Sequence, residues 1–415
     1  MVQKALTLLL FSSALFSQNL TLQLSIEKAL KNYPEIKAAS LQVERSKHSY
    51  DATFADYLPQ VDLRANYNFQ QTFALPQNGI FHTVDDSSWS AGASLKQKIW
   101  DFSKTSSKVA ASRVDKDISK LSLEESKALL VYKVKSLYEL MVVQNEAIKV
   151  RKKDLEAKEA YYKQSQAFVN QGLKTSADSS RFLSALYLAK ANLVESQAAF
   201  FKAKNSLSLY IGEYIPDDVD LQKDILTQEM AVEDGTLEKI LQTNYALKIR
   251  SHDIEKSKLL QKSAEASHFG SIDAIASYDQ ISSLNEYDSK LLGVTLNIPL
   301  YSGGKVSALS QEAAVTAQIA SEQKASQELA LKEESKNILE DIKLFSKTIL
   351  AKKAQLEASL QTTMLLDARY KEGLATYIEV LDASALQLDA KLGLLSAQYE
   401  KSSAIHRLEY LQGKI

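Results

Sequence analysis

The second half of this chain repeats the first, and this repeat constrains the architecture more than any other feature of the sequence. Residues 100–212 align with residues 301–413 at a constant offset of 201 and without a gap. Upstream, residues 36–67 match residues 247–278 at an offset of 211. A period of roughly 200 residues is far longer than the unit of a solenoid. The repeat therefore predicts two copies of one structural half, related by internal pseudo-twofold symmetry.

Each half contains one very long stretch without a helix breaker. The 415 residues include only 12 Gly and 5 Pro, and neither occurs in residues 103–171 or 305–372. At about 1.5 Å per residue, each stretch forms a helix of roughly 100 Å. Apolar residues such as Leu130, Val134 and Leu137 recur at alternating spacings of four and three, which is typical of coiled coils. Helices of this length need helical neighbours along most of their course.

Both stretches end at a Gly-Leu pair, and a second helix follows to residue 211 or 412. Glycine suits the left-handed end of a helix. A threonine then precedes an acidic residue by three positions, as in a capping box. Each half is therefore predicted to form a long antiparallel helical hairpin. The tip residues are Gly172, Leu173, Gly373 and Leu374; the threonines are Thr175 and Thr376, and the acids are Asp178 and Glu379.

Four segments alternate apolar and polar residues with a period of two. Each has the length of about 9 to 11 residues that a tilted strand needs to cross a bilayer, with lipid on one side and water on the other. The alternative is a two-faced sheet of a soluble protein, packed on helices. We expect residues 70–88 to form an external loop between the first two strands. The predicted strands cover residues 60–69, 89–99, 271–279 and 291–300.

The ends of the two halves define the predicted domain organisation. Lys4, an apolar run of about 12 residues and the small Ser17 are typical of a secretory signal peptide. The alternative is the start of an ordinary buried helix. The predicted segments are a signal peptide at 1–17, a first repeat at 18–212, an acidic mixed linker at 213–240 and a second repeat at 241–415.

Composition and motifs exclude several classes of function. The 50 basic and 51 acidic residues leave no basic excess for nucleic acid. The chain has no cysteine, which excludes thiol chemistry and disulfides. It has no phosphate-binding loop, no zinc-type histidine pair and no nucleophile elbow. We therefore predict neither an enzyme nor a cofactor or metal site.

Four strands per chain are too few for a membrane barrel. An open strand edge is not tolerated in lipid, and known barrels begin at eight strands. Closed symmetry among three copies would supply twelve strands. The predicted fold is mainly α with a small membrane β-barrel portion. Duplicated long antiparallel helical hairpins form a trimeric α-barrel, and four strands per chain contribute to a shared 12-strand β-barrel.

At this point the chain resembles the TolC family of trimeric outer-membrane efflux proteins, over essentially its whole length from about Leu20. The resemblance implies a channel-tunnel of the outer membrane with a long periplasmic extension. The homotrimer would be the passive exit duct of a tripartite efflux or type I secretion system. It would be docked by a periplasmic adaptor and an inner-membrane pump, and would open by outward movement of helices at the tip. The matching residues are 29–36 (ALKNYPEI), 170–173 (NQGL) with Asp178, and 370–383 (YKEGLATYIEVLDA).

The resemblance also assigns roles to residues near the tips. Glu379 and Asp382 lie three apart on one helical face, and in a trimer they would place six carboxylates around one constriction. Asp178 matches an acid at the first tip. Such a ring would favour cations in the pore. The alternative is a solvated helix start with acids near the positive end of the helix dipole.

Two further assignments concern closure and docking. Tyr370 matches a family position whose hydroxyl helps to hold the inner helices closed. The usual basic partner is replaced by Ala375, and Lys174 could substitute by pairing with a nearby acid. Gly172, Leu173, Gly373 and Leu374 would be the adaptor docking tips, unless they are plain helix ends.

A different class of function remains open from the residues alone. A soluble periplasmic adaptor or scaffold would also carry coiled-coil hairpins. Such proteins normally have one hairpin rather than two, and have no need of four strands with lipid-length alternation. Solubility without detergent would distinguish a scaffold from a membrane barrel.

Overall fold

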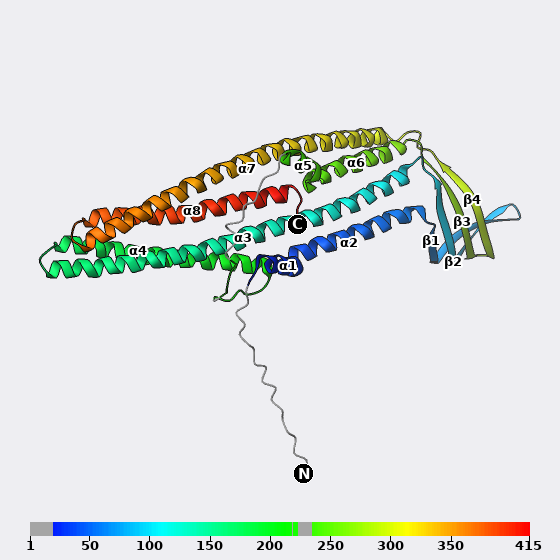
Figure 1. Ribbon diagram of the computed structural model, residues 1–415. Helices are drawn as coiled ribbons and strands as arrows, with labels where there is room; N and C mark the ends of the chain where they lie inside the picture. Colours follow the sequence, from blue (N-terminus) through cyan, green and yellow to red (C-terminus); the bar gives the residue numbers. More distant parts are fainter. Residues whose placement is uncertain (1–19, 218, 223–234) are drawn as a thin grey trace, which may run out of the picture. The chain divides into compact units, whose positions relative to one another are not determined.

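The computed structural model describes residues 20–217, 219–222 and 235–415, which form two compact units (Figure 1). The predicted signal peptide and most of the predicted linker lie outside the described residues. One unit comprises residues 37–125 and 244–330, and carries the sheet. The other comprises residues 20–36, 126–217, 219–222, 235–243 and 331–415, and is mainly helical.

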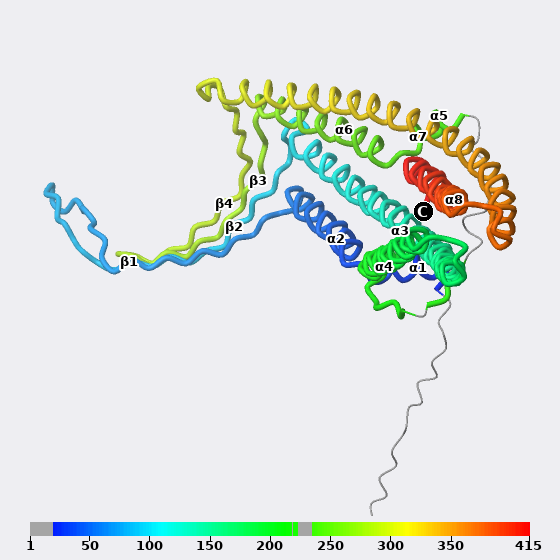
Figure 2. Tube along the Cα trace, turned by 90° about the vertical axis from the view of Figure 1, so that its left-hand side faces the viewer, coloured from blue at the N-terminus to red at the C-terminus, as the bar shows by residue number. Residues whose placement is uncertain are grey.

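The sheet unit holds one antiparallel sheet of four strands in the order β1-β2-β3-β4. Figure 2 shows the four strands side by side, with the β1–β2 pair extending past the ends of β3 and β4. The strands are β1 (Gln60–Gln77), β2 (Ile80–Trp100), β3 (Ser271–Ser282) and β4 (Glu286–Asn297).

The first two strands are longer than predicted, and residues 70–88 do not form a loop. Asn78 and Gly79 have φ angles of 51° and 80°, as a tight two-residue hairpin turn requires. Beyond a register shift between Asn68 and Gln71, the pairing continues to Gln77 and Ile80. Pro76 is tolerated in this extension because β1 is at the edge of the sheet.

The two faces of the sheet differ in polarity as the alternation predicts. Val61, Leu95, Ala276 and Leu292 form one row across all four strands. Val61 is 69% exposed and Leu292 is 87% exposed. On the opposite face, Gly92 leaves room for the Asp279 side chain, because a Cβ at this position would lie 2.0 Å from Asp279 Oδ1. Within the described residues, the sheet thus has an exposed apolar face, an opposite polar face, and two edge strands, β1 and β4, that pair on one side only.

Helices attach to the sheet at the ends of the strands. The unit contains the first parts of α3 (Lys104–Asn170) and α7 (Lys305–Lys371), together with α6 (Tyr245–Ala266) and most of α2 (Pro34–Phe54). A short 3₁₀ helix, η1 (Ala55–Tyr57), links α2 to β1. Ser263 Oγ on α6 donates a hydrogen bond of 2.9 Å to the backbone oxygen of Lys104, and Lys256 pairs with Asp115. These contacts fasten α6 to the start of α3.

The helical unit holds two long hairpins, formed by α3 with α4 (Ser176–Ile211) and by α7 with α8 (Tyr377–Leu411). It also contains α1 (Leu22–Asn32) and α5 (Thr236–Thr243). Val134 and Met141 of the coiled-coil pattern are fully buried. The mainly helical class with duplicated hairpins and four strands is therefore confirmed for the single chain.

The base of the first hairpin is fastened by α1. Asn32 Nδ2 donates a hydrogen bond of 3.0 Å to the Ile211 backbone oxygen, which satisfies a carbonyl at the end of α4. Lys28 forms a 2.6 Å ion pair with Glu213, and the Tyr33 and Tyr210 rings lie 5.2 Å apart. Among the described helices, none is both long enough and apolar enough to cross a membrane.

Candidate aperture and docking site at the hairpin tips

Both hairpin tips use the same hydrogen-bonded turn. The φ angles of Gly172 and Gly373 are +72° and +75°, in the left-handed region. At the first tip, Gly172 N donates to Val169 O at 3.0 Å, and Leu173 N donates to Phe168 O at 2.9 Å. The second tip repeats this pair of bonds at 3.0 and 2.8 Å. This pattern is the Schellman motif, which ends a helix and satisfies its last carbonyl groups.

The leucine of each tip is exposed to solvent. Leu173 is 64% exposed and Leu374 is 68% exposed. Both occupy the position after the left-handed glycine, so their backbone environments are equivalent. Each chain therefore presents two matched apolar side chains on rigid turns.

The acids that follow the tips are held in capping boxes. At the first tip, Asp178 Oδ2 accepts hydrogen bonds from Thr175 N at 3.2 Å and from Thr175 Oγ1 at 3.1 Å. At the second tip, Glu379 Oε2 accepts from Thr376 N and Thr376 Oγ1 at 2.7 and 2.8 Å. These bonds, from the backbone first, lower the pKa of the exposed Glu379 carboxyl. Both carboxylates are thus directed toward the starts of the returning helices.

Asp382 lies one turn further along α8 and is exposed. It shares a helical face with Glu379, because residues three apart are neighbours on a helix. Asp178 is brought close to Tyr370 of the other hairpin, and burial, followed by the Asp178 charge, raises the pKa of Tyr370 to about 12. The structure therefore brings together two predicted site residues from different hairpins, Asp178 and Tyr370.

Tyr370 lies at the centre of an aromatic cluster that joins the two tips. Its side chain is 1% exposed, and its ring centre lies 5.8 Å from that of Phe168 and 5.6 Å from that of Phe182. Tyr161 packs beside it at 6.3 Å. Ala375, which occupies the position of the family's basic residue, is buried in the same cluster. The two hairpins are therefore joined here by packed aromatic rings.

Two of the basic side chains near the tips, Lys174 and Arg369, differ in their contacts. Lys174, at the first tip, is partly exposed and forms no ion pair within the described part of the chain. Arg369 lies at the second tip, where its Nη2 donates a 3.4 Å hydrogen bond to the Leu374 backbone oxygen. It also contributes to the lowered pKa of Glu379. Arg369 was not among the site residues predicted from the sequence.

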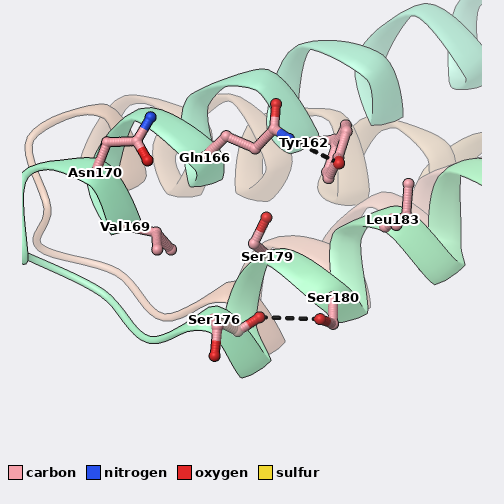
Figure 3. Close-up of a pocket in the computed structure, with 8 residues that line it drawn as sticks. All are labelled: Tyr162, Gln166, Val169, Asn170, Ser176, Ser179, Ser180 and Leu183. Atoms are coloured by element: carbon pink, nitrogen blue, oxygen red, sulfur yellow. Dashed lines mark hydrogen bonds between the residues drawn. The ribbon is translucent and has the colours of Figure 1, made fainter.

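A cavity of about 380 Å³ opens between α3 and α4 at the first tip (Figure 3). Neither this cavity nor the aromatic cluster around Tyr370 was predicted from the sequence. Both could have been suspected from the repeat, because the aromatic residues Tyr161, Phe168 and Phe182 have no aromatic partner at an offset of 201. The cavity is lined by Tyr162, Gln166, Val169, Asn170, Ser176, Ser179, Ser180 and Leu183.

Known outer-membrane proteins are similar to this chain over nearly its whole length. The TolC outer membrane protein of Vibrio cholerae serotype O1 is 21% identical, over 97% of this chain and 92% of the relative. The TolC protein of Escherichia coli K12 is 24% identical, over 94% of this chain and 81% of the relative. The crystal structure of the outer membrane protein VceC from Vibrio cholerae aligns with a TM-score of 0.83 at 16% identity, covering 95% of this chain and 96% of that one.

A family model adds direct evidence from the sequence. The model described as outer membrane efflux protein matches residues 25–213 and 236–414, which include both hairpins and all four strands. The chain therefore belongs to the outer membrane efflux protein family.

Proposed function

We propose that three copies of this chain form a channel-tunnel in the outer membrane, which is the passive exit duct of a tripartite efflux or type I secretion system. The proposal that the protein is a trimer rests on the structure of the sheet. It has an uncovered apolar face, and its edge strands β1 and β4 have no outer partner within the described chain. Pairing β1 of one copy with β4 of the next would remove every edge and close twelve strands.

The chain organisation fits this duct as two structural repeats. We infer a first repeat at 18–212 and a second at 241–415, joined by a mixed segment at 213–240 and preceded by a signal peptide at 1–17. Each repeat would contribute one strand pair and one helical hairpin to the assembly. Three chains then place six similar hairpins around one axis.

We propose that Asp178, Glu379 and Asp382 line the aperture at the tips. Their carboxylates follow the tips directly, and those of Glu379 and Asp382 are exposed. A ring of such groups attracts cations and repels anions. Opening would proceed by outward movement of helices at this end, with Tyr370 and Lys174 contributing to closure.

The adaptor would dock on the four tip residues Gly172, Leu173, Gly373 and Leu374. Six matched leucines per trimer offer small apolar contacts on identical turns, and this arrangement suits a partner with sixfold character. The energy for transport would come from an inner-membrane pump, and the duct itself would perform no chemistry.

The first test is the mass of the protein extracted from outer membranes in mild detergent, measured by light scattering with the detergent subtracted. The expected result is three times the mass of the mature chain. A water-soluble monomer or dimer would favour a periplasmic scaffold and refute the duct.

The second test is ion selectivity in a planar bilayer. Asp382→Asn should reduce the preference for cations, because three carboxylates leave the ring. Glu400→Gln, an exposed acid further along α8, makes the same charge change away from the tip and serves as the control. Equal selectivity in both variants would place the aperture elsewhere.

The third test concerns Lys174. If its ammonium pairs with an acid of a neighbouring hairpin, Lys174→Ala should raise single-channel conductance at rest. An unchanged resting conductance would show that Lys174 does not help to keep the channel closed.

A further inference from the structure

A smaller cavity, of about 70 Å³, lies between α3 and α8, which belong to different hairpins of the chain. Each helix contributes lining residues at spacings of three and four, which is the stripe that a helix presents to a coiled-coil partner. Such a stripe is ordinarily apolar, because its side chains lose contact with water. Here, by contrast, it includes charged and polar side chains. The lining residues are Val150, Lys153, Asp154 and Ala157 of α3, and Ser384, Gln387, Leu388 and Lys391 of α8.

The internal repeat indicates that helix packing by itself does not require these charges. At an offset of 201, Lys391 has a counterpart of the same kind in Lys190. The other polar lining residues correspond to uncharged residues in the other half of the repeat, namely Ala354, Gln355, Leu183 and Leu186. The charged cluster is therefore specific to the contact between α3 and α8.

A third lysine lies against this cavity and pairs with Asp154, the only acid among the lining residues. The Lys158 ammonium donates a hydrogen bond of 2.7 Å to Ser384 Oγ and lies 3.6 Å from Asp154 Oδ1. The side chains of Lys158 and Asp154 are only 9% and 8% exposed. Because Ser384 Oγ accepts its bond from Lys158, the hydrogen of the Ser384 hydroxyl remains available to a further acceptor.

The other two lysines at the cavity have no counter-ion. Neither Lys153 nor Lys391 forms an ion pair in the part of the chain that the structure describes. Burial, followed by repulsion from the Lys153 ammonium, lowers the pKa of Lys391, and the charge of Asp154 opposes this effect. Three lysines and one aspartate thus leave an excess of two positive charges. Charges removed from water are ordinarily paired, so this excess favours an anion in the cavity.

We propose that the cavity between α3 and α8 binds a small inorganic anion of the size of chloride, held between the ammonium groups of Lys153 and Lys391. The Ser384 hydroxyl and the Gln387 amide supply further hydrogen-bond donors. The volume is sufficient, because a single water molecule needs only about 10–15 Å³ of such space. The site lies within one chain, so it is independent of the proposed trimer.

The anion is a structural ligand that joins α3 to α8. In its absence, Lys153 and Lys391 repel each other across the contact. A ligand that binds the folded chain and not the unfolded chain stabilises the fold in proportion to the logarithm of its concentration above its dissociation constant. Chloride should therefore raise the stability of this protein beyond the general effect of ionic strength.

Thermal unfolding of the detergent-extracted protein in sodium chloride and in sodium gluconate, at equal ionic strength, tests the site. Gluconate is too bulky for the cavity. The thermal midpoint should be higher in chloride, and should rise with the logarithm of the chloride concentration. Lys391→Gln should abolish this difference between the salts. Its midpoint in gluconate should not fall below that of the parent protein, because the variant removes one of two repelling charges.

Lys152→Gln is the matched control. It makes the same change of charge at an exposed position of α3 that does not line the cavity, and should keep the chloride dependence of the parent protein. Lys153→Gln is an independent test from the other helix and should behave as Lys391→Gln does. Equal chloride dependence in the parent protein and all three variants would overturn the site.

Sodium phosphate distinguishes chloride from a larger inorganic anion. A gain in phosphate that Lys391→Gln removes, with no gain in chloride, would refute an anion of the size of chloride.

Crystals soaked in sodium bromide locate the ion, because bromide substitutes for chloride and scatters anomalously. The expected result is an anomalous peak between Lys153 and Lys391 that is missing from Lys391→Gln crystals. Bromide found only at exposed positions would contradict the proposal.

Discussion

A single buried histidine connects α3 to α8 in the helical unit. His406 Nε2 lies 2.8 Å from Glu139 Oε1, and His406 Nδ1 lies 3.3 Å from Glu409 Oε2. Both ring nitrogens face carboxylate oxygens, so both donate only when the imidazole is charged. Burial alone would lower the pKa of His406, but the two carboxylates outweigh it and raise the pKa. Hydrogen bonds from His406 and Lys135 hold the pKa of Glu409 at about 2.

These shifts predict a pH window for stability. Because the pKa of His406 is raised in the folded protein, its ion pairs stabilise the fold fully at pH values below its ordinary pKa of 6.5. This stabilisation is lost as the pH rises through the pKa of the folded state. Because the pKa of Glu409 is lowered, its hydrogen bonds stabilise the fold fully at pH values above its ordinary pKa of 4.5. This stabilisation is lost as the pH falls toward 2. The thermal midpoint of the detergent-solubilised protein should therefore be highest between these two ordinary values.

The matched variant is His406→Gln, measured by the same thermal scans. It removes the titrating imidazole, so the decline above neutral pH should become shallower. An unchanged alkaline decline would show that other groups control it. The acid limb should move to higher pH, because Glu409 loses its strongest hydrogen-bond donor.

The starts of the returning helices were predictable because they depend on local chemistry. Thr and an acid three residues apart form both capping boxes, and the preceding glycine adopts the positive φ that other residues avoid. Capping also affects the proposed aperture, because the hydrogen bonds from Thr376 lower the pKa of Glu379. The sequence indicated the cap, and the structure shows that the same oxygen accepts both bonds.

Thr376→Val should therefore change the pH dependence of cation selectivity. Without the hydroxyl bond, the pKa of Glu379 moves back toward its ordinary value of 4.5. The loss of selectivity on acidification should begin at a higher pH than in the parent protein, as measured by reversal potentials. Thr348→Val, which removes a hydroxyl that donates to the Leu344 backbone oxygen of its own helix, should leave the midpoint unchanged.

The sequence contains a signal for the turn between β1 and β2, but the prediction of a loop at residues 70–88 did not follow it. The Asn-Gly pair at 78–79 is a strong hairpin signal, yet Pro76 and the polar run that follows favoured a loop. The edge position of β1 makes the proline acceptable, and strand order is a property of the assembled sheet. The length of this hairpin therefore depended on tertiary pairing.

In the assembled duct, the polarity of the sheet determines which substitutions the membrane tolerates. Leu292→Lys places a charge on the apolar face, where a cation near the bilayer centre costs about 2–4 kcal/mol. Insertion of the refolded trimer into lipid vesicles should fall sharply. Thr295→Lys lies on the polar face of the same strand and should insert almost normally. Comparable losses in both variants would contradict lipid on the apolar face.

The repeat, the helix lengths, the strand alternation and the tip turns could all be read from the sequence. They depend on periodicity, on helix breakers and on backbone angles, which neighbouring residues determine. Among the candidate site residues, the positions of Gly172, Gly373, Asp178 and Glu379 relative to the helix ends follow from these local rules.

The partners of the long helices were decided only by tertiary structure. Tyr161 and Phe182 meet Tyr370 from roughly 200 residues away, and Glu139 meets His406 at a separation of 267. Which side chains meet depends on the rotation and axial stagger of packed helices. A heptad pattern leaves several combinations of these open, and complementary side-chain volumes select one of them.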